Sequence, residues 1–263
     1  MSHEPSIDAR RLRDAIAAAG LRLGTPLTWI ERTESTNDVA AREAASGAPH
    51  GATFLAEQQT GGRGRLGRKW FSPPGQNLYL SIVLRPDVPA ERLPCITLAI
   101  GLAVAEAITP FVPGIPVEVK WPNDVLIARR KAVGILVEAS TTGAGAMTLV
   151  AGIGINVLQT AFDPEIEGIA TSIAAHGPRP ERAQVLLAVL ERLSVRLEQF
   201  ERDGLSGMLG ELRARDATLG RRVRCASGEG LGAGIFDDGA LRVQTAAGEM
   251  IRVQAGEVEI LRA

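Results

Sequence analysis

The chain has 263 residues, 45% of them hydrophobic and 22% charged, with a formal net charge of −1 and an isoelectric point near 6.4. This composition is typical of a soluble globular protein, and the length allows one large domain and one small domain. A near-neutral balance argues against a protein whose main partner is nucleic acid. Two isolated cysteines and three scattered histidines argue against a disulfide framework and against a cysteine or histidine metal cluster.

The N-terminal segment is predicted to form one amphipathic helix over residues 7–23. Ile7, Leu12, Ile16 and Leu23 give it an apolar stripe, and arginines give it a basic face. A helix-turn-helix domain needs about 50–60 residues at ordinary helix and loop lengths. Residues 1–25 are too few for one, so we expect a helical extension that does not bind DNA.

No targeting or membrane segment is predicted. The first residues lack the basic and then apolar pattern of a signal peptide. The most apolar stretch, residues 95–105, is too short to cross a bilayer and predicts a buried helix. We therefore expect a cytoplasmic protein without a membrane partner.

Residues 26–217 are predicted to form a large mixed α/β domain. Hydrophobic alternation and turn residues predict strands over 27–31, 52–58, 77–85, 117–120, 125–127, 133–138 and 147–157. Apolar periodicity predicts helices over 39–45, 91–109, 181–203 and 209–217. Residues 129–131 are expected to form a turn, and residues 162–176, which show no period, a loop.

The last segment, residues 218–263, changes character. Short apolar stretches separated by glycines predict strands near 222–226, 230–236, 241–245 and 250–253. Asp238 and Gly239 are a typical hairpin turn. This segment therefore predicts a small β-barrel or β-sheet module.

Residues 61–70 carry four glycines and four basic side chains. Glycine-rich backbone can form a nest of N–H groups for an anion, and arginine can bind a carboxylate or phosphate through two parallel hydrogen bonds. This loop predicts a site where a phosphate ester and a carboxylate meet, with a mobile basic surface loop as the alternative. Trp70 and Phe71 follow directly, which suggests that this end of the loop is anchored in a core.

Three further motifs accompany this loop. Residues 35–37 (Ser-Thr-Asn) precede a helix and serve either as its cap or as pocket hydroxyls. Residues 120–124 (Lys-Trp-Pro-Asn-Asp) end a strand, and Lys131 comes shortly before the run from Gly134 to Glu138. Residues 152–156 (Gly-Ile-Gly-Ile-Asn) place paired glycines in a strand, which indicates close approach of a ligand or another backbone.

In this order, the motifs closely resemble those of bacterial biotin protein ligases, in a form without the N-terminal DNA-binding domain. The resemblance begins near Leu27 and extends through the C-terminal module. It implies a class II synthetase-like mixed β-sheet with helices and a C-terminal SH3-like β-barrel. It also implies a reaction in which biotin and ATP form biotinyl-5′-AMP, and a lysine of a biotin carboxyl carrier domain then accepts the biotinyl group.

The resemblance also assigns roles to individual residues. Catalysis is assigned to Arg65, Arg68, Asp124 and Lys131. Biotin binding is assigned to Ser35, Thr36, Asn37, Gln59, Gly62, Arg63, Arg65, Trp70, Lys131 and Gly134. ATP binding is assigned to Arg65, Arg68, Trp70, Asn123, Lys131 and Asn156, with Mg²⁺ carried on the nucleotide phosphates.

Two roles have structural alternatives. Asp124 either orients the incoming lysine and accepts its proton or only caps its turn. Trp70 either flanks the biotin rings or packs in the core. The loop at 158–173 contains Phe162 but lacks the tryptophan that covers adenine in some members of the family.

Three other functions compete with biotin ligation. A lipoate ligase shares the fold and the chemistry, a nucleic-acid-binding protein could use the basic loop, and a non-catalytic biotin sensor would need a damaged site. The Gly-Arg loop favours biotin, the near-neutral charge disfavours nucleic acid, and Lys131 and the arginines are intact. The resemblance allows a monomer or a homodimer.

Overall fold

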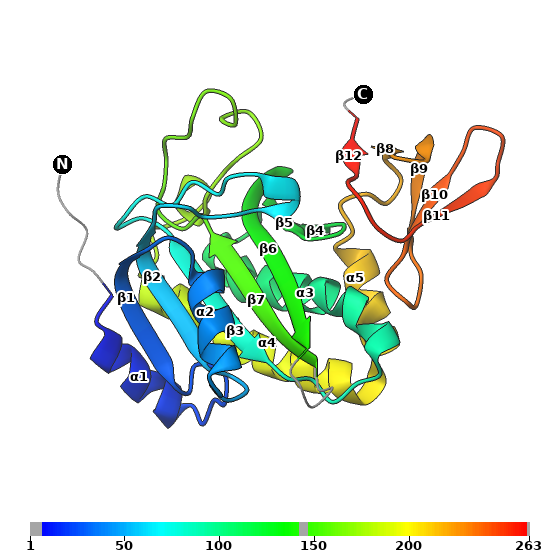
Figure 1. Ribbon diagram of the computed structural model, residues 1–263. Coiled ribbons are helices and arrows are strands. Elements are labelled where there is room, and N and C mark those ends of the chain that lie inside the picture. Colours follow the sequence, from blue (N-terminus) through cyan, green and yellow to red (C-terminus); the bar gives the residue numbers. More distant parts are fainter. Residues whose placement is uncertain (1–6, 142–146, 262–263) are drawn as a thin grey trace.

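The computed structural model describes residues 7–141 and 147–261, which form a large mixed sheet with helices and a smaller second sheet (Figure 1). The large sheet has the strand order β1-β2-β3-β7-β6-β5-β4. Its strands are β1 Leu27–Thr33, β2 Thr53–Gln59, β3 Leu78–Leu84, β4 Val117–Lys120, β5 Asp124–Ile127, β6 Arg130–Thr141 and β7 Met147–Ile155. Only β1 and β2 pair in parallel, which confirms the predicted mixed sheet.

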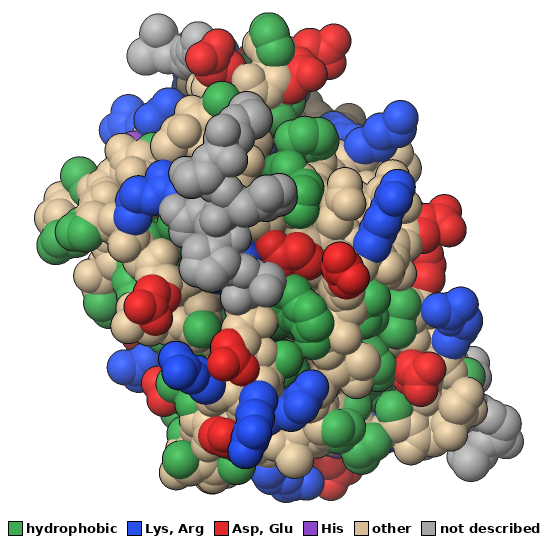
Figure 2. Space-filling view, turned by 90° about the vertical axis from the view of Figure 1, so that its left-hand side faces the viewer, with side chains coloured by type: hydrophobic (Ala, Val, Ile, Leu, Met, Phe, Trp, Pro, Cys, Tyr) green, Lys and Arg blue, Asp and Glu red, His purple; other side chains and the backbone are tan. Residues whose placement is uncertain are grey.

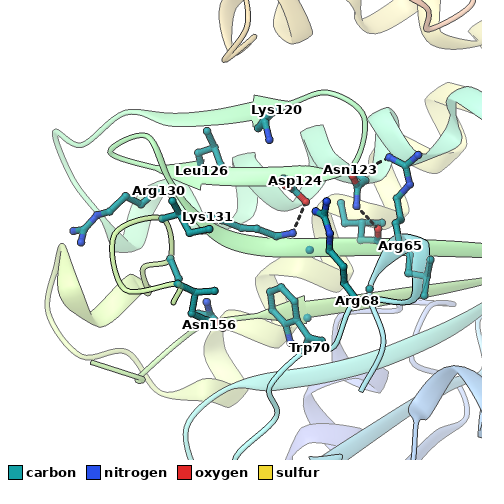
Figure 3. Close-up of a pocket in the computed structure, with 18 of the residues that line it drawn as sticks. Arg65, Arg68, Trp70, Lys120, Asn123, Asp124, Leu126, Arg130, Lys131 and Asn156 are labelled. Carbon is teal, nitrogen blue, oxygen red and sulfur yellow. Dashed lines mark hydrogen bonds and ion pairs between the residues drawn. The ribbon is translucent and has the colours of Figure 1, made fainter. Parts of the chain in front are cut away.

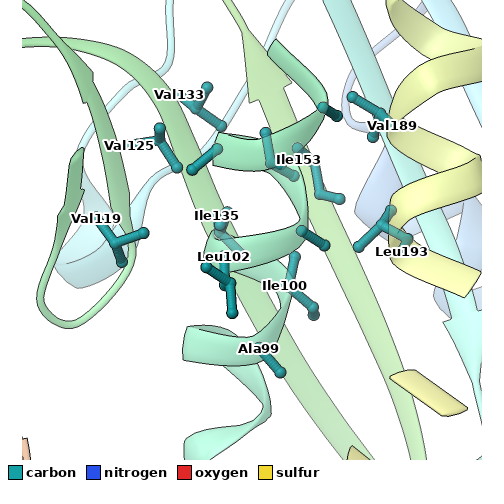
Figure 4. Close-up of a cluster of buried hydrophobic side chains, with 14 of the residues drawn as sticks. Ala99, Ile100, Leu102, Val119, Val125, Val133, Ile135, Ile153, Val189 and Leu193 are labelled. Carbon is teal, nitrogen blue, oxygen red and sulfur yellow. The ribbon is translucent and has the colours of Figure 1, made fainter. Parts of the chain in front are cut away.

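The two faces of this sheet are covered by different helices. Alternate residues of one strand belong to different cores: Leu55 packs in the larger cluster and Phe54 in the smaller one. The larger cluster includes α3 (Ile96–Ile108) and α4 (Arg182–Asp203), whose side chains meet those of β6 and β7 (Figure 4). The smaller cluster includes α2 (Thr36–Ala45).

Helix α3 is the core helix predicted from residues 95–105. Together with its flanking 3₁₀ turns it is long and apolar enough, by length and composition, to cross a membrane. Most of its side chains are buried between the sheet and α4 (Figure 4). That burial identifies α3 as the interior helix of a globular domain.

Several predicted boundaries were wrong for local reasons. The first helix, α1, spans only Ala9–Ala18, because Asp8 caps its start and Gly20 adopts a positive φ just after its end. The helix predicted over 91–109 is a 3₁₀ turn followed by α3, since Pro94 lacks the N–H that a continuous α-helix needs. Helix α5 ends early, at Leu209–Ala214.

The predicted turn at residues 129–131 is also corrected. Ala128 and Arg129 both adopt positive φ and form the turn, and β6 begins at Arg130. Lys131 is therefore a strand residue. Its side-chain direction is fixed by the sheet, which matters for the site described below.

The C-terminal sheet is antiparallel, as predicted, with the order β11-β10-β9-β8-β12. Its strands are β8 Arg222–Cys225, β9 Gly228–Ile235, β10 Leu241–Gln244, β11 Met250–Val253 and β12 Glu259–Ile260. The turn at Asp238 and Gly239 joins β9 to β10. The short strand β12 was not predicted.

The C-terminal sheet docks against the motif at residues 120–124. The indole Nε1 of Trp121 donates a buried hydrogen bond of 2.9 Å to the carbonyl oxygen of Gly239. A Cβ on Gly239 would lie 2.5 Å from Cβ of Cys95, so this close approach requires glycine. The small sheet thereby stands beside the edge of the large one that holds β4 and β5 (Figure 1).

Charges on the molecular surface are mixed. On the face drawn in Figure 2, acidic and basic side chains of the described residues are intermingled and do not gather into areas of one sign. This distribution agrees with the near-neutral net charge.

A buried ion pair links helix α4 to strand β2 and provides a test of this packing. Arg182 is 4% exposed at its side chain and lies 3.0 Å from a carboxylate oxygen of Glu57, which also accepts a hydrogen bond from the N–H of Gly75. Arg182→Ala should lower the free energy of unfolding by about 3–5 kcal/mol, because it leaves a buried carboxylate unpaired. Urea denaturation measures the change.

The matched control is Arg11→Ala, which removes an arginine whose side chain is 88% exposed and pairs with Asp8 at 3.4 Å. That change should cost less than about 1 kcal/mol. Equal losses in the two variants would contradict a structural role for the buried pair.

Candidate active site

One cavity of about 1560 Å³ opens between the Gly-Arg loop, the large sheet, the loop after β7 and the C-terminal sheet (Figure 3). Almost every residue assigned from the sequence lines it. These are Ser35, Thr36, Asn37, Gln59, Arg63, Arg65, Arg68, Trp70, Asn123, Asp124, Lys131, Gly134 and Asn156. Gly62 does not line the cavity, and its carbonyl oxygen instead accepts a hydrogen bond from the N–H of Trp70.

A polar group at the start of α2 forms one end of the cavity. Gln59 accepts hydrogen bonds through Oε1 from the N–H of Thr36 at 2.8 Å and from its hydroxyl at 3.1 Å. Ser35 occupies the N-cap position but makes no side-chain capping bond. The interpretation of Ser35 and Thr36 as caps alone was therefore wrong, since the side chain of Gln59 supplies the cap.

Asn37 is buried beneath this end of the cavity and is fully engaged. Its amide nitrogen donates to Glu138 at 2.6 Å, and its amide oxygen accepts from the hydroxyl of Ser81 at 2.6 Å. Gly152 has no room for a Cβ because the Asn37 amide lies directly against it. One of the two strand glycines therefore serves this contact. Ser81 gave no signal in the sequence beyond its place in a predicted strand.

Trp70 lies flat on the sheet over a pair of glycines. Gly134 and Gly154 are register partners in β6 and β7, and a Cβ on either would approach the indole to 2.8 Å or 2.5 Å. Lys131 places its Nζ 5.4 Å from the centre of the indole. Phe71 is 65% exposed, so the expected aromatic anchor consists of Trp70 alone.

The arginines of the loop are held by counter-groups from three different elements. Arg63 forms two hydrogen bonds, of 2.6 Å and 2.7 Å, to the carboxylate of Asp38 in α2. These bonds hold the pKa of Asp38 below its ordinary value. Asp38 was not predicted as a site residue, and its position one residue after the Ser-Thr-Asn motif was the available signal.

Arg65 and Arg68 reach the loop between β11 and β12 of the C-terminal module. Arg65 donates to Asn123 Oδ1 at 3.2 Å and to the carbonyl oxygen of Gly256 at 3.1 Å. Arg68 forms an ion pair with Glu257. The loop between β11 and β12 therefore belongs to the site, which sequence reasoning missed because nothing in the sequence places it beside the Gly-Arg loop.

Lys131 and Asp124 form an ion pair at the centre of the cavity, with Nζ 2.7 Å from Oδ1 (Figure 3). The backbone of Lys131 is fixed on its far side, because its N–H donates to Ile169 at 2.7 Å and its carbonyl accepts from Thr171 at 2.9 Å. Asn156 donates to the carbonyl of Thr171 at 3.0 Å and holds the same segment. The loop after β7 thus supports Lys131 directly.

One further lining residue was overlooked. Lys120 belongs to the motif at residues 120–124, yet it received no role from the sequence. It lies in β4 opposite Asp124 of β5 and points into the cavity (Figure 3). Burial lowers the pKa of its ammonium group below the ordinary lysine value.

The cavity thus combines the polar groups of Thr36 and Gln59, the indole of Trp70 and a cluster of cations. Comparison with known proteins identifies the family to which such a site belongs. Residues 29–156 match the model of the Biotin/lipoate A/B protein ligase family. The biotin–[acetyl-CoA-carboxylase] ligase of Mycobacterium tuberculosis is 35% identical, and the alignment covers 98% of this chain and 97% of that protein. The chain belongs to the biotin protein ligase family.

A bifunctional ligase/repressor of Bacillus spizizenii is 34% identical over 90% of this chain and 75% of its own length. Among solved structures, the biotin protein ligase of Aquifex aeolicus in complex with biotin and ATP superimposes with a TM-score of 0.77. The two sequences are 34% identical, and the superposition covers 90% of this chain and 99% of the Aquifex chain. The predicted family and fold class are thus confirmed.

The paired glycines under Trp70 provide a test of the site in the absence of ligand. Gly154→Ala should displace the indole, because a Cβ at that position would lie 2.5 Å from it. We expect a changed near-ultraviolet circular dichroism spectrum and a loss of about 1–3 kcal/mol in unfolding free energy from overpacking.

Gly210→Ala is the matched control, since a Cβ there meets nothing within 4 Å and the position lies in helix α5. It should leave the spectrum unchanged and preserve or raise stability. A Gly154→Ala protein with the wild-type spectrum would show that the indole does not rest on the sheet.

Proposed function

We propose that this protein activates biotin with ATP as biotinyl-5′-AMP and then transfers the biotinyl group to a lysine of a biotin carboxyl carrier domain. The observation that carries the proposal is the Lys131–Asp124 pair, which lines the same cavity as a polar socket at Thr36 and Gln59 and the arginines at 65 and 68. A carboxylate held at Lys131 would meet a phosphate held by those arginines.

The socket fits the ureido ring of biotin, which carries one carbonyl and two N–H groups. Burying such a ring without partners costs about 1–3 kcal/mol per unpaired group. Thr36 and Gln59 offer hydroxyl and amide groups, and Ser35 and Asn37 flank them. The indole of Trp70, which rests on Gly134, would pack against the apolar part of the ring system.

Adenylation joins two anions. A carboxylate oxygen of biotin attacks the α-phosphorus of ATP, and the bond from that phosphorus to the bridging oxygen breaks as pyrophosphate leaves with the electron pair. Arg65 and Lys131 stabilise the charge where carboxylate and phosphate meet, and Arg68 faces the leaving group. Arg63, which is held by Asp38, would act mainly through its backbone beside the biotin ring.

Transfer requires a neutral amine, because a lysine with a pKa of about 10.4 is mostly protonated at neutral pH. Asp124 lies at the centre of the cavity and can orient the incoming amine and accept its proton. The amine nitrogen attacks the acyl carbon of the adenylate, the bond to the phosphate oxygen breaks, and AMP leaves. The turn-capping alternative for Asp124 is weaker, since its carboxylate faces Lys131.

The nucleotide would lie beside Asn123 and Asn156, with Phe162 in the adjoining loop. Mg²⁺ would arrive on the phosphates of ATP, because Mg²⁺ is usually bound through substrate phosphates and water with few protein ligands. Its chemistry would be to neutralise phosphate charge. We also propose the division into residues 1–25, 26–217 and 218–263, a cytoplasmic location, and a monomer or homodimer without a DNA partner.

Removing the ammonium of Lys131 should abolish most activity. With a purified carrier domain, labelled biotin and Mg·ATP, Lys131→Ala should transfer biotin at least about 100-fold more slowly than wild type, because a charge-stabilising group at the reacting centre is lost. Arg130→Ala is the matched control, since the neighbouring cation points away from the cluster (Figure 3) and should retain near-full activity. Equal activity of Lys131→Ala and wild type would overturn the role.

The amide of Gln59 should set the preference for biotin over lipoate, which has no ureido ring. Gln59→Leu should raise KM for biotin about tenfold or more, from the loss of one or two buried hydrogen bonds. Gln58→Leu, a change one position earlier outside the cavity lining, should leave KM nearly unchanged. If wild type used lipoate as readily as biotin, the lipoate ligase assignment would replace this one.

A further inference from the structure

The chain contains 26 arginines and only three lysines, at positions 69, 120 and 131. All three lysines line the cavity. A lysine ammonium is a compact charge with three freely rotating donors, whereas the guanidinium group of arginine is a planar fork. The cavity therefore holds every lysine of the chain, together with several of its arginines.

Lys120 is a cation of the cavity without a directly bonded counter-group. Within residues 7–141 and 147–261, its Nζ makes no hydrogen bond and no ion pair, although the side chain is half-buried. By contrast, Arg63, Arg65, Arg68 and Lys131 are held by Asp38, Asn123, Glu257 and Asp124, respectively. A half-buried ammonium without a partner is unfavourable, so this position is suited to an incoming anion.

The surroundings of Lys120 indicate which anion. Its charged neighbours are Asp124, Lys131, Glu257 and Arg68. Lys131 is the proposed contact for the carboxylate, and Arg68 is the proposed contact for the leaving group. Lys120 is therefore placed near the polyphosphate end of the nucleotide, and it can bind there without first breaking an ion pair.

We propose that Lys120 binds the departing pyrophosphate of ATP during adenylation, an inference that rests on the proposed function. As the bond from the α-phosphorus to its bridging oxygen breaks, the electron pair moves onto pyrophosphate. The Lys120 ammonium donates hydrogen bonds to the pyrophosphate oxygens and stabilises that charge. Arg68 can add its charge once it releases Glu257.

This role belongs to one half-reaction only. Pyrophosphate has left the site before the carrier lysine attacks, so Lys120 has no anion to stabilise during transfer. A general structural role, or a role in activating the carrier lysine through Asp124, would instead slow transfer as well.

The test separates the two half-reactions. Lys120→Gln should lower the rate of biotin-dependent ATP–pyrophosphate exchange about 10- to 100-fold, as expected for a lost charged hydrogen bond. Single-turnover transfer from synthetic biotinyl-5′-AMP to the carrier domain should stay within about twofold of wild type. Lys120→Arg, which restores the positive charge, should recover part of the exchange rate.

The outcomes distinguish failure of the proposed function from failure of the Lys120 assignment alone. No biotin-dependent exchange by the wild-type protein would overturn the proposed function itself. An active wild type with unchanged exchange in Lys120→Gln, or with exchange and transfer lowered together, would overturn only the assignment of Lys120. Thermal unfolding and biotin binding establish that the variant is folded.

A second measurement uses the wild-type protein and does not depend on any variant folding. Because the chain has three lysines, amine acetylation followed by peptide mass spectrometry reports on each one separately. Mg·pyrophosphate should protect Lys120 from acetylation, whereas biotin alone should not. Equal labelling of Lys120 with and without Mg·pyrophosphate would contradict the proposal.

Discussion

Several cations converge on one cavity, and like charges at such spacing repel one another unless counter-groups lie among them. In this protein each counter-group comes from a different element: Asp38 from α2, Asp124 from β5 and Glu257 from the loop between β11 and β12. The site is therefore held together by ion pairs between these elements. Assembly of the site depends on the sheet, the helix and the small C-terminal module being in place together.

Glycines in the central strands leave space for side chains of the site to lie against the sheet. Gly134 and Gly154, which are paired on β6 and β7, let the Trp70 indole lie directly against the sheet, and Gly152 does the same for the Asn37 amide. Lys131 lies on the same strand as Gly134, and its backbone is fixed by the loop after β7. Asp124 and Lys131 therefore project from strands, which hold side chains in position more precisely than loops do.

Much of this could be read from the sequence because the relevant signals are local. Strand alternation predicted the strands, and the glycine-arginine run and the motif at residues 120–124 predicted parts of the site. The order of these motifs, which resembles that of a known family, indicated that they form one site. What could not be read depends on contacts distant in sequence: Gln59 capping α2, Glu257 reaching Arg68, and Trp121 reaching Gly239. The start of β6 was missed because two non-glycine residues adopt positive φ, which propensity does not predict.

The central claim is that one cavity brings a carboxylate and a nucleotide together at the Lys131–Asp124 pair. The most direct measurement is product analysis after the protein is mixed with biotin and Mg·ATP, without any carrier. The account predicts about one biotinyl-5′-AMP retained per chain, with one pyrophosphate released and no ADP, only when both substrates are present. Release of ADP, or the absence of any biotin-dependent product, would contradict it.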